Sequence, residues 1–235
     1  MQLSRRLTLI ASMVDKTDSV ADVGTDHGYV PIYLVENNIV SKAIAMDINQ
    51  GPLTRADENI KRKGLDNRIT TRLSDGVREL KPGETDAIVV AGMGGQLIIK
   101  ILEEGRNVFK SAKQIILSPH SDMEMVRRYL VDNDYYIHDE AMVTDDGKYY
   151  TVIKVIGNTE SRNGEEYDRE EYFLYGKKLL EKKDEVLKMF LEKEESNIHN
   201  ILDRIKGGNE DVVSAKGTEL NKKLDIIKKC KLYYN

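Results

Sequence analysis

The feature that most constrains the fold is an alternation of β-rich runs with helical patterns, ending in two β-rich runs with no helix between them. Such alternation over residues 1–156 predicts a parallel sheet with helices on both faces. The last two runs, residues 135–143 and 148–156, are separated by TDDG, a tight-turn signal that predicts an antiparallel hairpin at the sheet edge. We therefore expect an α/β domain with a seven-stranded, mostly parallel sheet. The five earlier strands are predicted at residues 19–24, 42–48, 68–75, 85–95 and 113–119.

The sequence changes character after residues 157–166, which read as a linker. From there on it contains no proline, and apolar residues recur at three-and-four spacing from Tyr172 to Ile205 and from Val212 to Ile227. The pattern predicts two helices joined by the turn KGGNED and packed as an antiparallel coiled coil. A helical extension that covers the sheet domain is the alternative. We place the domains at residues 1–158, Rossmann-like, and 159–235, helical.

Composition excludes several classes of protein. The single cysteine, Cys230, rules out a disulfide framework or a cysteine-based metal site within one chain, and the scattered histidines imply no metal chemistry. The net charge of −4 argues against a generic polyanion binder, although a local basic patch remains compatible with it. Neither a signal-peptide pattern nor an apolar stretch of the roughly 20 residues that a membrane helix needs is present. We expect a cytoplasmic monomer without a membrane association.

The stretch DVGTDHGY follows the first predicted strand and resembles a ligand-binding glycine loop. Gly24 and Gly28 allow a tight turn and a close backbone approach. Their spacing does not match G-x-G-x-x-G, which opposes a pyrophosphate cradle and a nicotinamide dehydrogenase. Acids at Asp22 and Asp26 suit the ammonium and sulfonium of S-adenosylmethionine (SAM). The alternative for Asp26 is a cap on the following helix.

Acidic residues also end the second and third predicted strands. Asp47 lies about twenty residues beyond the glycine loop, where an acid commonly holds ribose hydroxyls, although it also fits as a helix cap. Asp75 and Gly76 follow the third strand and suit the adenine amino group and ring, with a surface turn as the alternative. Enzymes that use NAD share the ribose acid, so Asp47 indicates an adenosine ribose rather than a particular reaction.

The stretch VVAGMGG follows the fourth predicted strand, where many amino-group methyltransferases carry N/D-P-P-Y/F. Here Ala91, Gly92 and Met93 occupy that place, so the usual carbonyl-and-ring clamp for an exocyclic amine is missing. The glycines predict a close backbone approach to the methyl-transfer site, with a flexible strand-to-helix turn as the alternative. The terminal hairpin is typical of Rossmann-like methyltransferases, whereas dinucleotide dehydrogenases usually lack it.

Together, LSRRLTLIASMV, DVGTDHGYVPIYL, AMDINQGPL, LSDGV and AGMGG resemble the bacterial tRNA adenine-22 N1-methyltransferases over nearly the full length. The resemblance implies methyl transfer from SAM to N1 of an adenine in the tRNA D-arm region, with S-adenosylhomocysteine (SAH) as product. The chain departs from the family in having LSPHS, with Ser118, Pro119 and His120, where family members often have LQP. The implied cofactor-binding residues are Asp22, Gly24, Thr25, Asp26, Gly28, Asp47, Ile48, Asp75, Gly76, Ala91, Gly92 and Met93.

Adenine N1 is itself a competent nucleophile, so the enzyme mainly has to flip the base and align N1 with the methyl group. The methylated base is cationic, and a nearby carboxylate stabilises it or accepts a proton. Asp26 is the first candidate for a catalytic residue and His27 the second, with a packing or backbone-bonding role as the alternative for His27.

Positively charged residues are the candidates for binding tRNA, mostly by its shape and phosphates. A solvated helix face is the alternative reading of any one of them. Two other functions stay open, namely methyl transfer to another RNA or macromolecule, and non-catalytic binding of SAM or RNA. The candidate RNA-binding residues are Arg5, Arg6, Lys61, Arg62, Lys63, Lys222, Lys223, Lys228 and Lys229.

Overall fold

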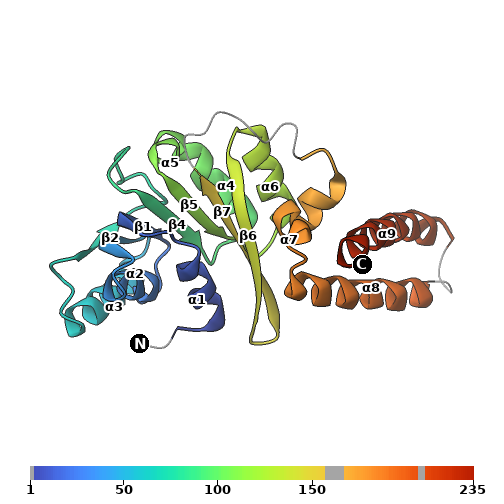
Figure 1. Cartoon of the computed structure of the whole chain (residues 1–235), viewed down its shortest axis with the longest axis horizontal. Helices are drawn as coiled ribbons and strands as arrows, with labels where there is room; N and C mark the ends of the chain where they lie inside the picture. Colours follow the sequence, from blue (N-terminus) through green and yellow to red (C-terminus); the bar gives the residue numbers. More distant parts are fainter. Residues whose placement is uncertain (1–2, 157–166, 206–209) are drawn as a thin grey trace. The chain divides into compact units, whose positions relative to one another are not determined.

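The computed structural model describes residues 3–156, 167–205 and 210–235 of the chain. It divides into two compact units, Met1–Glu166 and Tyr167–Asn235. The domain boundary predicted after residue 158 falls outside the described residues. Figure 1 labels most of the elements of both units.

The first unit is built on one seven-stranded sheet with the order β3-β2-β1-β4-β5-β7-β6. Neighbouring strands among β1 to β5 are parallel, and β7 runs antiparallel to both β5 and β6. This confirms the predicted seven-stranded, mostly parallel sheet. The strands are β1 (Thr17–Val23), β2 (Val40–Asp47), β3 (Ile69–Leu73), β4 (Ala87–Ala91), β5 (Gln114–Ser118), β6 (Tyr136–Asp145) and β7 (Lys148–Ile156).

Helices cover both faces of this sheet, with α1, α2 and α3 on one face and α4, α5 and α6 on the other (Figure 1). Apolar side chains of α1, α2 and α3 join those of the central strands in one buried core. Helix α5 was not predicted, because six residues directly after Gly105 are too few to show a helical period. The helices are α1 (Arg5–Ser12), α2 (Tyr29–Glu36), α3 (Gln50–Arg62), α4 (Gly95–Glu104), α5 (Arg106–Ser111) and α6 (Met123–Asp132).

The hairpin of β6 and β7 closes with a two-residue turn at Asp146 and Gly147. Both residues have positive φ, 48° and 70°, and the flanking Asp145 and Lys148 are paired. Positive φ at both central positions matches the right-handed twist of the two strands, and aspartate followed by glycine is favoured there. The TDDG signal thus produces the turn that was expected from it.

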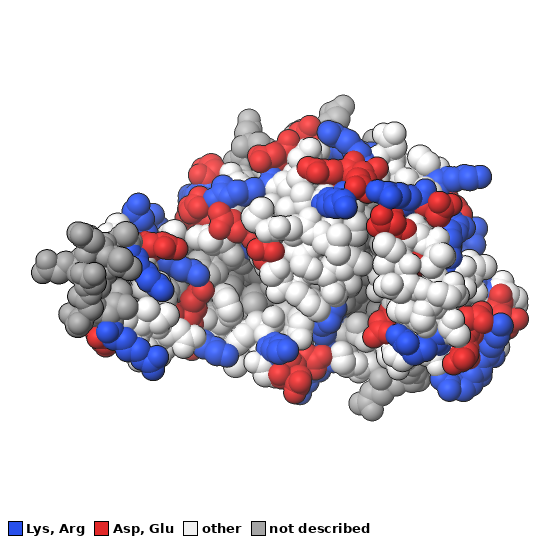
Figure 2. Space-filling model, turned by 180° about the vertical axis from the view of Figure 1, so that it is seen from behind, with Lys and Arg blue, Asp and Glu red and all other residues white. Residues whose placement is uncertain are grey.

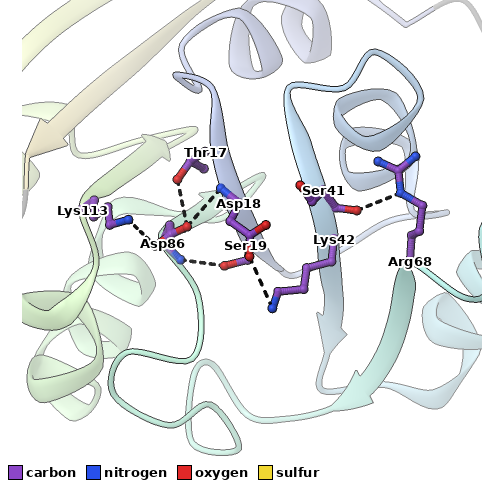
Figure 3. Close-up of polar contacts among 8 residues, drawn as sticks. All are labelled: Thr17, Asp18, Ser19, Ser41, Lys42, Arg68, Asp86 and Lys113. Carbon is purple, nitrogen blue, oxygen red and sulfur yellow. Dashed lines mark hydrogen bonds and ion pairs between the residues drawn. The ribbon is translucent and has the colours of Figure 1, made fainter.

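At the amino ends of the strands, Asp86 ties three neighbouring strands together (Figure 3). Its carboxylate accepts hydrogen bonds from the Thr17 hydroxyl and the Asp18 backbone N–H, both at 3.0 Å, and lies 2.8 Å from the Lys113 ammonium. The hydrogen bond from Lys113 is the main reason why the pKa of Asp86 lies below its ordinary value. This network holds the edge of the sheet opposite to the candidate site.

The second unit is helical, as predicted. Antiparallel packing of its two long helices places Lys223 of the last helix 2.6 Å from Glu194, and the Tyr234 hydroxyl donates to the Asp184 carbonyl oxygen at 2.8 Å. The coiled-coil packing itself stays a prediction, and most of the predicted turn KGGNED lies outside the described residues. The elements are a π-helical turn (Tyr172–Gly176), α7 (Lys177–Glu181), α8 (Glu185–Ile205), α9 (Glu210–Lys231) and a final 3-10 turn (Leu232–Tyr234).

The single helix predicted from Tyr172 to Ile205 is wrong, because the structure interrupts it between α7 and α8. Lys183 adopts a left-handed conformation with φ of 54°. The Asp184 carboxylate then accepts the backbone N–H groups of Val186 and Leu187, both at 2.9 Å. A side chain that accepts hydrogen bonds from backbone N–H groups of the first turn caps the start of a new helix. The spacing of apolar residues does not reveal this break, because it continues on both sides of it.

Candidate active site

A cavity of about 620 Å³ lies at the carboxyl ends of β1, β2 and β4. In an open α/β sheet, ligands bind at this edge, near the point where the strand order reverses. Here the order reverses between β1 and β4. Eight of the twelve predicted cofactor-binding residues line the cavity, namely Asp22, Gly24, Asp26, Asp47, Ile48, Ala91, Gly92 and Met93.

The glycine loop after β1 is held by the neighbouring strand. The backbone N–H groups of Gly24 and Thr25 both donate to the Met46 carbonyl oxygen at 2.8 Å. Gly24 and Gly28 have φ of 77° and 69°, and a Cβ on Gly28 would lie only 3.3 Å from the Cβ of Ala56. The two glycines therefore let the chain turn sharply and let α2 start close to α3. Gly24 lines the cavity, whereas Thr25 and Gly28 do not.

Asp22 is the most perturbed acid of the cavity. Its side chain is buried, and burial raises the pKa of the carboxyl to about 6, with a hydrogen bond from Thr25 lowering it and the charge of Asp47 raising it further. A carboxylate in this position is destabilised without a positive partner. A ligand that carries an ammonium group would supply that partner.

Asp47 and Ile48 form the opposite end of the cavity from the β4 loop. One Asp47 carboxylate oxygen accepts the backbone N–H of Asn49 at 2.7 Å, which fixes the side chain at the end of β2. Ile48 is 59% exposed although it is large and apolar. The apolar side chain of Ile48 can pack against a base, and the Asp47 carboxylate beside it can accept hydrogen bonds from hydroxyl groups. A nucleoside carries both a base and ribose hydroxyl groups.

Asp26 and His27 do not occupy equivalent positions. Asp26 lines the cavity, and its carboxylate lies 3.4 Å from the His27 Nε2 and 3.8 Å from the Arg55 guanidinium. The first residue before α2 is Gly28, and no side chain caps this helix, so the capping alternative for Asp26 is not found. His27, with φ of 59°, stacks on Tyr29 at 5.2 Å and does not line the cavity.

Asp75 and Gly76 lie outside the cavity lining as well. The Asp75 carboxylate is 3.0 Å from the Arg78 guanidinium. Gly76 has φ of 60°, and a Cβ there would come 3.2 Å from the side chain of Ile101. Turn geometry and packing account for both residues in this structure, and their contact with adenine stays a prediction.

The loop after β4 is packed against the loop after β5. The backbone N–H of Gly92 donates to the Ser118 carbonyl oxygen at 3.2 Å, and the His120 N–H donates to the Met93 carbonyl oxygen at 2.8 Å. A Cβ on Gly95 would lie 2.6 Å from the Ser121 carbonyl oxygen, so glycine is required there by packing. These contacts bring His120, from the stretch LSPHS, to the cavity wall.

Arg6, one of the predicted RNA-binding residues, lies in the wall of the cavity. Its guanidinium carbon lies 5.1 Å from the centroid of the Tyr150 ring, and its backbone N–H donates to the Asp145 carboxylate at 3.1 Å. His120 meets the edge of the same ring, with centroids 5.8 Å apart. Sequence reasoning missed Asp145 and Tyr150, since no local pattern shows that the hairpin reaches α1.

Most of the other predicted RNA-binding cations are paired with neighbouring groups. Lys61, Lys63, Lys223 and Lys228 form ion pairs with Asp57, Glu36, Glu194 and Asp225, and Arg62 donates to the Asn59 side chain. Arg5, Lys222 and Lys229 are exposed. Figure 2 shows positive and negative side chains interspersed on the face that it presents. Contact of these residues with RNA stays a prediction.

The described residues contain neither a membrane-spanning helix nor a metal-binding cluster. No helix there is long and apolar enough to cross a membrane. In the same ranges, no three His, Cys, Asp or Glu side chains are grouped so that they could hold a metal ion.

Comparison with known proteins shows which family the chain resembles. Residues 3–153 match the family model described as a methyltransferase domain. The chain is 39% identical over 153 residues, 65% of its length, to the tRNA (adenine(22)-N(1))-methyltransferase of Bacillus subtilis, and this alignment spans 64% of that relative.

Solved structures are similar over nearly the whole chain. The crystal structure of the Bacillus subtilis m1A22 tRNA methyltransferase has a TM-score of 0.85 at 31% identity, with 97% of this chain and 98% of that chain covered. The Streptococcus pneumoniae protein described as a putative tRNA (m1A22) methyltransferase, in complex with SAM, has a TM-score of 0.83 at 29% identity, with 97% and 99% covered.

Proposed function

The chain belongs to the tRNA (adenine(22)-N1)-methyltransferase family, and from this premise we propose that it transfers the methyl group of SAM to N1 of adenine 22 in tRNA. The observation that carries the proposal is the cavity at the carboxyl ends of β1, β2 and β4, which gathers Asp22, Asp47 and the glycine loops. We expect it to act as a monomer in the cytoplasm.

The residues of the cavity fit SAM. Asp22, buried and with its pKa raised to about 6, would pair with the ammonium of the methionine part. Asp47 would accept hydrogen bonds from the ribose hydroxyls, and Ile48 would cover one face of the adenine ring. Gly24 lets the backbone approach the ligand closely. When bound, SAM supplies an electrophilic methyl group on a sulfonium.

The chain contributes mainly positioning and electrostatics to the reaction. Adenine N1 carries its own lone pair, so alignment of N1 with the methyl group is the main requirement. Base flipping costs a few kcal/mol, which contacts in the pocket offset. The product base is cationic, and Asp26, whose carboxylate lines the cavity, is our candidate for stabilising that charge. His27 is a weaker candidate because its side chain does not line the cavity.

The tRNA is expected to lie against several positively charged residues as well as the cavity. Arg5, Lys222 and Lys229 are exposed and suited to phosphate contacts. The remaining candidates, Lys61, Arg62, Lys63, Lys223 and Lys228, would have to exchange their present intramolecular partners for phosphates.

The test is methyl transfer from labelled SAM to unmodified tRNA that contains adenine 22, with the product nucleoside mapped. A matched tRNA with guanine at position 22 is the control. We expect N1-methyladenosine at position 22 and none in the control. Methylation at another adenine would indicate a different RNA site, and binding of SAH without turnover on any tRNA would favour a non-catalytic module.

A further inference from the structure

Arg6 is a positively charged side chain in the wall of the cavity, on the side away from Asp47. Its guanidinium lies over the Tyr150 ring, with 5.1 Å from guanidinium carbon to ring centroid. It also lies against the loop after β4, because a Cβ on Gly92 would come 3.1 Å from Arg6 Nη2. All three residues line the same cavity.

The guanidinium of Arg6 has no ion pair or hydrogen bond within the described part of the chain. Its Nε is buried and lacks a hydrogen-bond partner. Asp145, in the hairpin, accepts the backbone N–H of Arg6 at 3.1 Å, and its charge attracts the guanidinium although the two side chains form no salt bridge. Burial is the main reason why the pKa of Arg6 lies below its ordinary value. The guanidinium is thus half-buried, attracted by Asp145 but without a hydrogen-bond acceptor among the described residues, so its N–H groups are suited to an anion from outside the chain.

The sheet order shows on which side of the cavity this anion would lie. Across the sheet the strands follow as β2, β1, β4, β5 and β7. The two acids assigned to the cofactor, Asp47 and Asp22, belong to β2 and β1, whereas Arg6 contacts the end of β4 and Tyr150 of β7. Arg6 therefore faces the part of the cavity left for the acceptor.

The charge of the acceptor decides which of its groups suits Arg6. Adenine is neutral and becomes cationic on methylation, so a guanidinium next to N1 would oppose the product. The phosphodiester groups that flank the nucleotide are anionic, and their oxygens match the planar fork of arginine.

We propose that Arg6 binds the phosphodiester next to the target adenosine and thereby positions the flipped nucleotide. Asp145 fixes the start of α1 through the Arg6 N–H, and the Tyr150 ring supports the guanidinium face. Gly92 leaves room for the side chain because it has no Cβ. The inference rests on the proposed function and assigns to Arg6 a role on the acceptor side of that site.

The experiment compares the wild type with Arg6→Ala and Arg6→Lys, using the whole chain. Each protein is assayed for kcat/KM on tRNA and for SAH affinity by calorimetry. Lys16→Ala is the matched control, since Lys16 is an exposed cation at the opposite edge of the sheet. We expect Arg6→Ala to lower kcat/KM about 10- to 100-fold, Arg6→Lys to recover part of this loss, and all variants to bind SAH like the wild type.

Replacing one phosphodiester at a time with an uncharged methylphosphonate identifies the phosphate that Arg6 contacts. Two tRNAs carry a single methylphosphonate, one immediately 5′ and one immediately 3′ of the target adenosine. We expect one of them to lower kcat/KM of the wild type and of Lys16→Ala, and to cause no further loss with Arg6→Ala, because the contact is already gone.

Three results would overturn the inference. If each methylphosphonate lowers kcat/KM of Arg6→Ala by the same factor as it lowers kcat/KM of the wild type, Arg6 does not contact these phosphates. Weaker SAH binding by Arg6→Ala would place the guanidinium on the cofactor instead. Unchanged kcat/KM in Arg6→Ala would remove the role altogether. A wild type without activity on any tRNA is a different outcome, since it contradicts the proposed function itself and the inference with it.

Discussion

Asp22 and Asp47 lie at the carboxyl ends of the adjacent parallel strands β1 and β2, and the charge of Asp47 adds to burial in raising the pKa of Asp22 to about 6. The free protein thus keeps two acids side by side in one cavity. Such an arrangement is unfavourable for folding but prepares the site for a cation.

The first prediction concerns stability against pH. The pKa of Asp22 is higher in the folded chain than the ordinary value of 3.8, so protonation favours folding, and this contribution is lost as the pH rises from about 4 to about 6. At pH 8, Asp22→Asn should therefore have a higher free energy of unfolding than the wild type, by about 3 kcal/mol at most. Urea unfolding measures this difference. The difference should vanish near pH 4. Equal stability of the two proteins at pH 8 would contradict the raised pKa.

The second prediction concerns the cofactor. If ionised Asp22 pairs with the ligand ammonium, SAH affinity should fall as the pH drops below about 6. Asp22→Asn should bind SAH about 10- to 100-fold more weakly at pH 8 and should lose that pH dependence. Calorimetry between pH 5 and pH 8 measures both. A wild-type affinity that is flat through about pH 6 would speak against the pairing.

The third prediction tests the ribose contact of Asp47. Asp47→Ala should lower SAH affinity by about tenfold or more, because the hydroxyl groups lose a charged acceptor. Asp18→Ala is a suitable control, since Asp18 is exposed at the opposite edge of the sheet. The ribose assignment is wrong if Asp47→Ala binds SAH like the wild type.

The fourth prediction concerns a buried ion pair whose residues do not line the cavity. Arg127 Nε lies 2.7 Å from Glu140 Oε1, and both side chains are 1% exposed or less. Arg127→Met leaves a buried carboxylate without its cation and should cost about 3–5 kcal/mol. The neighbouring Arg128→Met removes a partly exposed pair with Glu124 and should cost at most about 1 kcal/mol. Urea unfolding distinguishes the two, and equal losses would refute the argument from burial.

The fifth prediction concerns the glycines after β4. In Gly95→Ala the new Cβ would meet backbone atoms of Ser121 and Asp122, which cannot move without shifting the loop. We expect a loss of about 1–3 kcal/mol in unfolding free energy. In Gly94→Ala the nearest atom is the Ser121 hydroxyl at 3.3 Å, which can rotate away, so the loss should be smaller. The reverse order of the two losses would count against a packing role for Gly95.

The sheet could be predicted from sequence because its signals are local. Apolar runs, the TDDG turn and the acids that follow each strand lie within a few residues of the structure that they determine. For the same reason the sequence indicates Asp22, Gly24 and Asp47 as candidates, and all three line the cavity. Family resemblance added the reaction, which the spacing of these residues did not supply.

The acceptor side could not be predicted in this way. Arg6, Asp145 and Tyr150 meet only because β7 inserts between β5 and β6, and because the hairpin turn reaches the start of α1. Likewise, the break before α8 depends on a left-handed Lys183, which apolar spacing does not reveal.

The hydrogen bond from Arg6 to Asp145 joins residues 139 positions apart. During synthesis the amino-terminal helix leaves the ribosome first, but the carboxylate that fixes its start appears only with the hairpin. A nascent chain that ends before β6 already carries Asp22 and Asp47, yet it lacks both hairpin residues that hold Arg6. The wall that Arg6, Asp145 and Tyr150 form is therefore completed on the ribosome only after both acids of the cavity have been synthesised.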